Sequence, residues 1–558
     1  MAAQAGMGFL PPAALNTNAV TDSGLDEQPQ IATDSLGHWV AVWDSNDTLG
    51  GTIGSEQDIL FSRSTDNGAT WTAPAALNTN AATDTGNDTG PQITTDGLGN
   101  WVSVWLSNDS LGGTIGSDND ILVSRSTNNG ATWSAPAALN TNAASDTGND
   151  RSPQVTTDAA GHWVAVWYST DTLGGTIGTD ADILVSRSTN NGATWSAPAA
   201  LNSNAATDSG FDQLPQVTSD GTGHWVAVWI SDDTLGGTID TDADILVSRS
   251  TNNGATWSAP AALNTNAASD LGTDDRPDVT TDGAGHWLAV WTSDDALGGT
   301  IGTDSDVLFA RSTNNGATWS APAALNANAA TDSGSDYMPQ VTTDGAGRWV
   351  AVWHSSDTLG GTLGTDLDIL VSRSTDNGAA WSAPVALDST AATDTGIDDR
   401  SQTATDGAGH WVATWRSNEP LGVPYGTDSD IMFSTMDRAT DTDGDGIDDM
   451  SETNTGTYVD SWDTGSDPSL TDTDIDSLPD GWEVSYTLDP NDDGSGDLDN
   501  GPLGDPDGDG FSNWEEYDRN SDPRDPNSVP LPALGLMGLM AAGVALAGIG
   551  LTSLRRRR

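Results

Sequence analysis

The sixteen residues RSTNNGATWSAPAALN occur unchanged at Arg125–Asn140, Arg187–Asn202, Arg249–Asn264 and Arg311–Asn326. The Trp inside this phrase recurs every 62 residues, at Trp71, Trp133, Trp195, Trp257, Trp319 and Trp381. A constant period of this size is typical of arrays whose units bury their apolar faces only against neighbouring units. The phrase therefore predicts a repeat protein.

Each unit contains four short segments with the alternating pattern of β-strands. In the third unit they are PQVTTD (Pro153–Asp158), HWVAVWY (His162–Tyr168), DILVSRS (Asp182–Ser188) and ATWSAPAAL (Ala193–Leu201). The second segment is apolar on both faces, as expected for a sheet that lies between two others.

The number of units predicts the architecture. The first three segments occur seven times, but the fourth follows only six of them. The chain opens with an unpaired fourth segment, FLPPAALNTN (Phe9–Asn18), in register with the later copies. A strand from the N-terminus that completes the last sheet leaves no open edge in the ring. The sequence predicts an all-β fold, a seven-bladed β-propeller over residues 1–437 closed by its N-terminal strand.

The repeated phrase contains a recognisable motif. STNNGATW (Ser126–Trp133) resembles the Asp-box (BNR repeat), Ser-x-Asp-x-Gly-x-Thr-Trp, of sialidase-like propellers, and STDNGATW (Ser64–Trp71) carries the Asp itself. Asp or Asn caps local N–H groups in such a turn, and Gly allows a positive φ. The resemblance implies that these boxes lie on the face opposite the active site. We therefore interpret the phrase, with the Arg that begins it, as scaffold.

Two positions differ between otherwise uniform units. The residue after the second Trp of the second strand is Asp44, Leu106, Tyr168, Ile230, Thr292, His354 or Arg416. The pairs before the first strand are Glu27-Gln28, Thr89-Gly90, Arg151-Ser152, Gln213-Leu214, Asp275-Arg276, Tyr337-Met338 and Asp399-Arg400. Antiparallel neighbours should bring these positions together near the central channel. A varied face on a uniform repeat is typical of a binding surface, whereas neutral drift at exposed tips is the alternative.

This face predicts binding of a glycan or another surface ligand. The candidate ligand-binding residues are Asp44, Arg151, Tyr168, Arg276, Tyr337, His354, Arg400 and Arg416. The alternative function is a divergent exo-sialidase-type glycoside hydrolase. The resemblance then implies an Arg151, Arg276 and Arg400 clamp with Tyr337 as nucleophile and Glu27 as its partner, although the Arg-Ile-Pro motif of the family is absent.

Acidic residues outnumber basic ones throughout. The formal net charge is −63 and no Lys occurs, which argues against nucleic acid as a partner. The absence of Cys excludes a disulfide framework. Loop carboxylates such as Asp180 and Asp182 could bind Ca²⁺, but a solvated polar loop is the interpretation we favour at this point.

Residues 438–527 predict a calcium-binding stalk. Three loops, Asp441–Glu452, Asp472–Glu483 and Asp505–Glu516, place oxygen ligands at positions 1, 3, 5, 9 and 12. They resemble thrombospondin type 3 and EF-hand-like repeats, which implies Ca²⁺ as cofactor; an acidic disordered linker is the alternative. The candidate ligands are Asp441, Asp443, Asp445, Asp449, Glu452, Asp472, Asp474, Asp476, Asp480, Glu483, Asp505, Asp507, Asp509, Asn513 and Glu516.

The C-terminal residues 528–558 predict membrane attachment. Leu531 to Leu554 carry no charge, which is enough for one transmembrane helix, and four Arg follow. SVPLPA with this helix and basic stop resembles exosortase-class sorting signals (PEP-type, VPLPA variant). The resemblance implies export, a sorting transpeptidase as partner, and a cell-surface location; a plain anchor is the alternative. No signal peptide is visible at the N-terminus, so we expect either a missing upstream segment or a wrongly assigned start.

Overall fold

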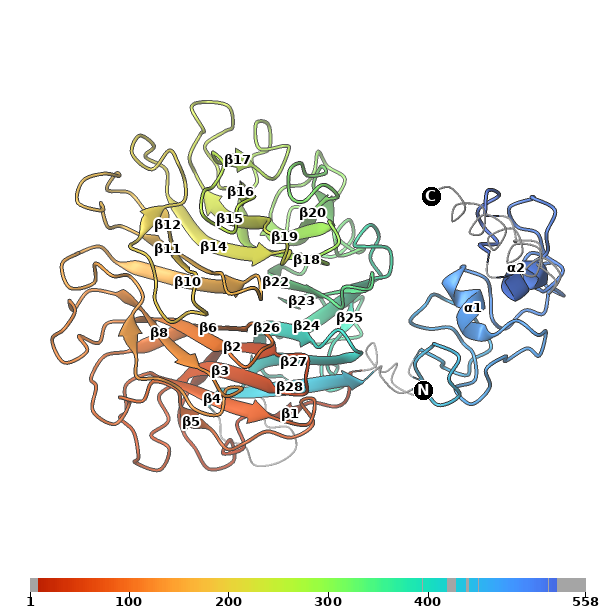
Figure 1. Cartoon of the computed structure of the whole chain (residues 1–558), viewed down its shortest axis with the longest axis horizontal. Coiled ribbons are helices and arrows are strands. Elements are labelled where there is room, and N and C mark those ends of the chain that lie inside the picture. Colours follow the sequence, from red (N-terminus) through yellow and green to blue (C-terminus); the bar gives the residue numbers. More distant parts are fainter. Residues whose placement is uncertain are drawn as a thin grey trace, which may run out of the picture. The chain divides into compact units, whose positions relative to one another are not determined.

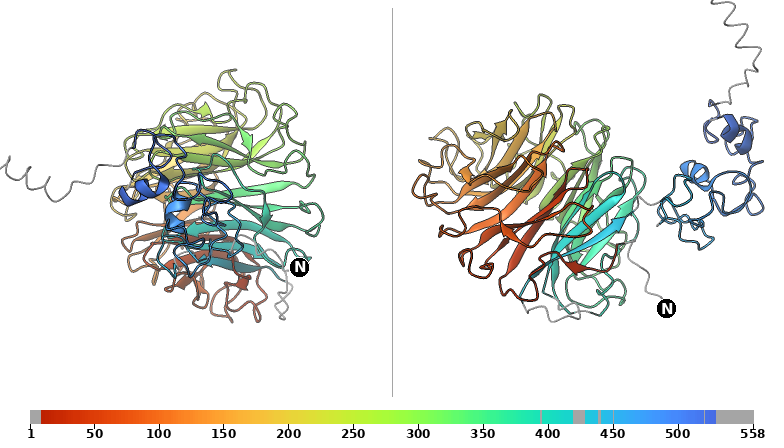
Figure 2. Two further views of the ribbon diagram at one scale, coloured as in Figure 1. Left: turned by 90° about the vertical axis from the view of Figure 1, so that its right-hand side faces the viewer. Right: turned by 60° about the horizontal axis from the view of Figure 1, so that its bottom comes forward.

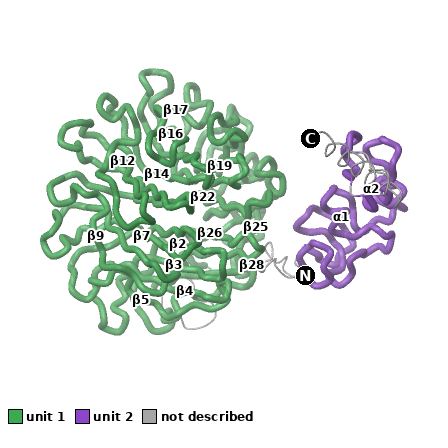
Figure 3. Tube along the Cα trace, in the orientation of Figure 1, with its two compact units in different colours: residues 1–437 green, residues 438–558 purple. Residues whose placement is uncertain are grey.

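The computed structural model describes residues 9–393, 395–418, 428–437, 441–449, 451–519 and 521–528. Contacts between Cα atoms divide the chain into two compact units, residues 1–437 and 438–558, which Figure 3 colours separately. Each unit is described by itself below.

The first unit consists of seven antiparallel sheets of four strands each. The innermost strands are β2 (Asp26–Thr33), β6 (Asp88–Thr95), β10 (Asp150–Thr157), β14 (Asp212–Ser219), β18 (Asp274–Thr281), β22 (Asp336–Thr343) and β26 (Asp398–Thr405). The second strands are β3 (Trp39–Ser45), β7 (Trp101–Ser107), β11 (Trp163–Ser169), β15 (Trp225–Ser231), β19 (Trp287–Ser293), β23 (Trp349–Ser355) and β27 (His410–Ser417). The third strands are β4 (Asp58–Ser64), β8 (Asp120–Ser126), β12 (Asp182–Ser188), β16 (Asp244–Ser250), β20 (Asp306–Ser312), β24 (Asp368–Ser374) and β28 (Asp430–Asp437). The outermost strands are β5 (Ala75–Ala76), β9 (Ala137–Ala138), β13 (Ala199–Ala200), β17 (Ala261–Ala262), β21 (Ala323–Ala324), β25 (Val385–Ala386) and β1 (Ala13–Ala14).

The seven sheets close into a ring. Each innermost strand contacts the next one along the chain, and β26 contacts β2. The seventh sheet has the order β1-β28-β27-β26, with Ala13 opposite Phe433 and Ala14 opposite Met432. Figure 1 shows β1 beside β28, and the second view of Figure 2 shows the red first blade next to the cyan last one. The predicted seven-bladed propeller and its closure by the N-terminal strand are confirmed.

Tryptophan fills the space between blades. Trp163 and Trp167 of β11 are fully buried and pack against Val102 and Val104 of the preceding blade. The same arrangement repeats around the ring, because the second strand of every blade carries two buried Trp. Both faces of this strand are therefore core, which accounts for its apolar sequence.

The repeated phrase forms a turn that also joins blades. Asn128 Oδ1 accepts hydrogen bonds from Ser126 Oγ (2.9 Å) and from the N–H of Thr132 (3.0 Å). Arg63 of one blade donates to the carbonyl of Asn129 in the box of the next (2.6 Å). The Asp-box-like turn and its Arg are thus scaffold, as the sequence predicted.

The outermost strands are much shorter than expected. The pattern predicted a strand over Ala193–Leu201, but only Ala199–Ala200 pairs with β12. Side-chain hydrogen bonds of the box hold the segment before it in a turn, and Pro198 has no N–H to donate. Single bonds from Ser196 and Leu201 to β12 flank the short ladder.

Replacement of the box glycine is expected to destabilise the ring. A Cβ on Gly192 would lie 2.6 Å from Val102 Cγ2 of the neighbouring blade, and its φ is +71°. We expect Gly192→Ala to lower the free energy of unfolding by about 2–4 kcal/mol, measured by denaturant titration. Gly175→Ala is the matched control, because Gly175 also has a positive φ (+85°) but has nothing within 4 Å. An equal loss in both variants would contradict the blade–blade contact.

The second unit is built mainly from loops. It contains two short helices, α1 (Asp480–Ser485) and α2 (Asn513–Arg519), and Trp482 of α1 contacts Tyr517 of α2. No helix in the described part of the chain is long and apolar enough to cross a membrane. The transmembrane helix expected within 531–554 lies outside the described residues.

Candidate functional site

The two variable positions meet in every blade. Arg151 at the start of β10 pairs across the ladder with Tyr168 near the end of β11. The other six pairs are Glu27 with Asp44, Thr89 with Leu106, Gln213 with Ile230, Asp275 with Thr292, Tyr337 with His354, and Asp399 with Arg416. A β-bulge follows the first member of each pair.

The residue in each bulge has a left-handed backbone. These residues are Gln28 (φ 53°), Gly90 (60°), Ser152 (49°), Leu214 (48°), Arg276 (52°), Met338 (51°) and Arg400 (57°). Only Gly adopts this conformation without cost, and other residues lose about 1–2 kcal/mol each. Six of the seven blades keep a side chain at this position in spite of the strain.

All seven bulge residues line one cavity of about 380 Å³. Arg151, Tyr168 and Leu106 also line it, together with prolines and glutamines of the innermost strands. Three Arg therefore face this cavity from the third, fifth and seventh blades. Its lining includes no carboxylate among the described residues. In a chain of 81 acidic and 18 basic residues, such a surface is an exception.

A ring of glutamine side chains lies next to this cavity. A second cavity of about 290 Å³ is lined by Gln30, Gln92, Gln154, Gln216, Gln340 and Gln402, and by Asp278 at the equivalent place in the fifth blade. Asp278 Oδ2 accepts a hydrogen bond from the N–H of Val341 (2.9 Å). Burial raises the pKa of Asp278 to about 6. These glutamines were not predicted as site residues, because only positions that differ between blades were considered. Their near invariance among the seven blades was the signal that could have identified them.

Four of the eight predicted ligand-binding residues line the cavity, and Asp44, Tyr337, His354 and Arg416 do not. Arg151, Arg276, Arg400 and Tyr168 line the cavity. Asp44 and His354 are 0% and 6% exposed and are not part of its lining. Burial raises the pKa of Asp44 to about 7 and lowers that of His354 to about 4. These two side chains are buried and do not belong to the cavity surface.

Glu27 belongs to an ion-pair network across the ring closure. It accepts hydrogen bonds from Arg400 (3.3 Å) and Arg416 (3.1 Å), and Arg416 also binds Asp399 with two nitrogens (2.7 and 2.5 Å). Tyr337 instead lies against the ring of His354, 5.8 Å between centroids. No hydrogen bond joins Tyr337 to Glu27 in the described structure, so the nucleophile–base pair of a sialidase-type site is not formed.

The acidic loops of the second unit bury carboxylates without partners. The Glu at loop position 12 is 2% exposed at Glu452 and 0% exposed at Glu483 and Glu516. Both carboxylate oxygens of Glu483 and Glu516, and one of Glu452, lack any hydrogen-bond partner. Burial, and then repulsion from loop carboxylates, raises the pKa of Glu452 to about 8 and of Glu483 to about 11.

Other loop positions show how the turns are made. Gly446 and Gly510 have φ of 100° and 95°, and Ser477 takes the same left-handed form with φ 86°. The oxygens of Asp449 and Asp480 at position 9 accept hydrogen bonds from the backbone and hydroxyl of Thr442 and Thr473. These two carboxylates close the loops, while one oxygen each of Asp443, Asp474, Asp476, Asp507 and Asp509 is buried and unpartnered.

This geometry defines a seven-bladed β-propeller with Asp-box-like repeats, followed by an acidic loop unit. No family model and no curated protein matches the chain. Among solved structures, a protein of unknown function from Dyadobacter fermentans is 13% identical, with 77% of this chain and 98% of that chain covered and a TM-score of 0.43. A Hadza microbial sialidase is 14% identical, with 59% and 63% covered and a TM-score of 0.37. The alpha-L-arabinanase of Penicillium chrysogenum is 15% identical, with 62% and 92% covered and a TM-score of 0.38.

Proposed function

We propose that the propeller binds an anionic, hydroxyl-rich ligand, an acidic glycan, in the axial cavity. The observation that carries this proposal is the lining: Arg side chains from three blades and no carboxylate, in a chain with a net charge of −63. Arg binds planar carboxylate groups through two parallel hydrogen bonds. Arg151 is exposed and has no ion-pair partner among the described residues.

The remaining lining suits a sugar. Glutamine amides such as Gln28 and Gln30 both donate and accept hydrogen bonds, which matches hydroxyl groups. Tyr168 and the prolines supply apolar surface for the faces of a sugar ring. The cavity volume of about 380 Å³ lies within the usual range of small-molecule sites, roughly 300–1,000 Å³.

The positions of Glu27 and Tyr337 fit binding without hydrolysis better than they fit a hydrolase. Glycoside hydrolysis of the retaining type needs a nucleophile and an acid/base on either side of the scissile bond. Glu27 is held by Arg400 and Arg416, while Tyr337 packs on His354. The exo-sialidase-type hydrolase remains the second candidate, since three Arg are gathered as its carboxylate clamp requires.

We also propose that the second unit holds Ca²⁺ in its three loops. The residues present fit such an ion, because buried oxygens of Glu452, Glu483 and Glu516 lack partners and no soft ligand occurs beside them. The resulting function is a glycan-binding propeller on a calcium-stabilised stalk at the cell surface. The proposed membrane anchor and sorting signal, residues 528–558, lie almost entirely outside the residues that the structure describes.

Loss of a cavity arginine is expected to weaken binding. We expect the full chain in Ca²⁺ to select carboxylated over neutral saccharides on a glycan array. Arg151→Ala and Arg276→Ala should each weaken the affinity roughly 10- to 100-fold by calorimetry, the value of one charge-assisted hydrogen bond. Arg348→His is the control, because it removes one positive charge at a turn where five other blades carry His.

Two outcomes would contradict binding at this site. Equal loss of affinity in Arg348→His would indicate a general charge effect. Turnover of a fluorogenic sialoside that is lost in the Arg276→Ala/Arg400→Ala double variant would favour the hydrolase. Arg276→Gly provides a check of the strained bulge: it should bind as poorly as Arg276→Ala but exceed it in free energy of unfolding by about 1 kcal/mol.

A further inference from the structure

Clusters of carboxylates lie at six junctions between blades in the described part of the first unit, separate from the three acidic loops of the second unit. At the second junction, Asp118 precedes β8, Asp120 is the first residue of β8, and Asp146 belongs to the loop that follows β9. Each of the three offers an oxygen, and these oxygens lie within 4.8 Å of one another. Two oxygens bound to one Ca²⁺ at about 2.3–2.6 Å are separated by at most about 5 Å.

One oxygen of each carboxylate in this cluster is buried and has no hydrogen-bond partner. Asp120 is 1% exposed, and its Oδ2 has no hydrogen-bond partner. Asp118 Oδ2, Asp146 Oδ1 and the amide oxygen of Asn142 are likewise buried and unpartnered. The equivalent Asp182 in the next blade is also 1% exposed. The interpretation of Asp180 and Asp182 as a solvated loop is therefore wrong, because the loop after the outermost strand covers these carboxylates.

Neighbouring amides fix the other carboxylate oxygens. Asn140 Nδ2 donates to Asp120 Oδ1 (2.7 Å), and Asn142 Nδ2 donates to Asp146 Oδ2 (2.7 Å). Amides orient a carboxylate but do not neutralise it, and no Arg or His pairs with these carboxylates among the described residues. Burial and repulsion from Asp146 and Asp118 raise the pKa of Asp120 to about 7, which reflects the cost of the bare cluster.

The same arrangement recurs around the ring. The corresponding groups are Asp22, Asp428 and Asp430; Asp180, Asp182 and Asp208; and Asp242, Asp244 and Asp270. At the first junction Glu56 stands in the place of Asp118, and the three neighbouring carboxylates are Asp58, Asp84 and Asp88, the last of which begins β6. At the following junction Asp304, Asp306 and Asp332 each have a buried oxygen without a partner. With the group of Asp120, five junctions carry Asp at all three positions, and the first junction has its own group of three carboxylates, which makes six groups in the described part of the chain.

We propose that each of these junctions binds one Ca²⁺ ion, so that the propeller carries a ring of structural cations. The ligands at the second junction are Asp118, Asp120 and Asp146, with the amide oxygen of Asn142 beside them. An all-oxygen set without His or Cys suits a hard divalent cation. Ca²⁺ fits an irregular set of carboxylate and amide oxygens better than Mg²⁺, which demands octahedral geometry.

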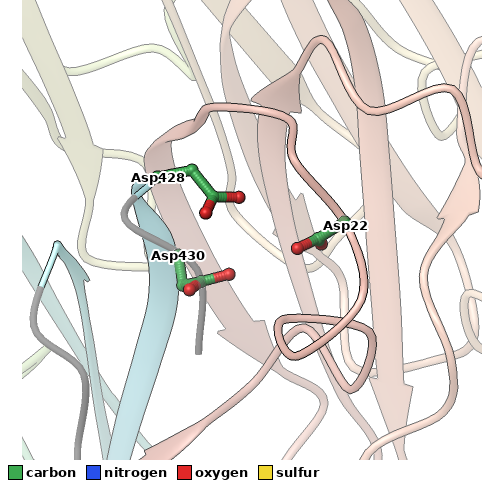
Figure 4. A group of neighbouring side chains, drawn as sticks. All are labelled: Asp22, Asp428 and Asp430. Atoms are coloured by element: carbon green, nitrogen blue, oxygen red, sulfur yellow. The ribbon is translucent and has the colours of Figure 1, made fainter. Parts of the chain in front are cut away.

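The ion at the closing junction would join the two ends of the propeller. Asp22 belongs to the segment between β1 and β2, whereas Asp428 precedes β28 and Asp430 is its first residue. Figure 4 shows the three carboxylates turned toward a common space from these two parts of the chain. A cation there supplements the short ladder between β1 and β28, which pairs only two residues on each side.

The number of bound ions tests the proposal. In a loop-silenced chain, with Glu452→Gln, Glu483→Gln and Glu516→Gln together, we expect about six tightly bound Ca²⁺ by equilibrium dialysis and elemental analysis. The unaltered chain should bind about nine, since the three acidic loops add theirs. Three or fewer ions on the unaltered chain, or none on the loop-silenced chain, would overturn the proposal.

A variant at a single site distinguishes a Ca²⁺ ligand from a carboxylate with a purely structural role. In the loop-silenced chain, Asp120→Asn should release one Ca²⁺, lower the melting temperature in Ca²⁺ and raise it in EDTA, because it removes both a ligand and a source of repulsion. Asp96→Asn is the control in the same blade: Asp96 is 5% exposed, and both its oxygens already accept hydrogen bonds. It should change the melting temperature equally in both solutions. The same result for Asp120→Asn would refute the site, and Asp118→Asn repeats the test at a less buried ligand.

Discussion

Deletion of residues 1–18 is expected to open the propeller and to convert it into an aggregating species. The deletion removes β1 and with it Leu15, which is fully buried against Ala41, Trp43, Leu60 and Ile431. It also removes Asn16, which donates to Asp26 (2.7 Å) and Asp430 (2.8 Å). The edge of β28 is then unpaired, and free edges recruit other strands. Light scattering coupled to size-exclusion chromatography would detect the oligomers, and denaturant titration the loss of stability.

Two controls separate closure from general damage. Deletion of residues 1–8 leaves β1 in place and should have no such effect. Leu15→Ala should cost about 2–5 kcal/mol, whereas Leu10→Ala, at a side chain that is 55% exposed, should be nearly neutral. A synthetic peptide of residues 9–24 should restore the monomer of the deleted chain by adding the missing strand. A deleted chain that stays monomeric with unchanged stability would show that closure is dispensable.

Chelation of Ca²⁺ is expected to unfold the second unit. Glu483 and Glu516 are fully buried with no partner for any carboxylate oxygen, so without a cation their burial is unfavourable. An ion bound at 1,000 times its dissociation constant contributes about 4 kcal/mol per site, comparable to the whole stability of a small domain. Hydrogen exchange measured by peptide should show protection of residues 441–528 in Ca²⁺ and its loss in EDTA.

A pair of adjacent residues provides the matched comparison. Glu516→Gln should lose protection around α2 even in Ca²⁺. Glu515→Gln should keep it, because Glu515 Oε2 accepts bonds from the N–H (3.2 Å) and the hydroxyl (3.5 Å) of Ser512, which an amide oxygen can also accept. Protection that survives EDTA in the unaltered chain, or equal behaviour of the two variants, would contradict a role for Ca²⁺ in this unit.

The fold was predictable because its information is local and repeated. The period of 62 residues, the apolar second strand and the orphan segment Phe9–Asn18 determined blade number and closure. The box turn followed from short-range hydrogen bonds between Ser126, Asn128 and Thr132. The sequence pattern did not predict that the outermost strands are so short. The Asp-box-like turn uses backbone groups that the pattern had assigned to strand pairing.

The candidate site was predictable only in part. Cross-strand register placed Arg151 beside Tyr168, as antiparallel pairing requires. The sequence could not show that the bulge directs Arg276 and Arg400 to the axis, since a positive φ at a non-glycine residue has no local signature. Nor could it pair Glu27 with Arg416, a contact made only when the first blade meets the seventh.

The sequence by itself determined the class of fold, the number of blades, the way the ring closes and the positions at which the blades differ. Only the tertiary structure decided which acidic residues are solvated. Asp120 and Asp182 stand next to polar loops in the sequence, yet both are 1% exposed because the loop that follows the outermost strand covers them. Burial depends on what packs over a residue, and here the covering segment comes from elsewhere in the chain.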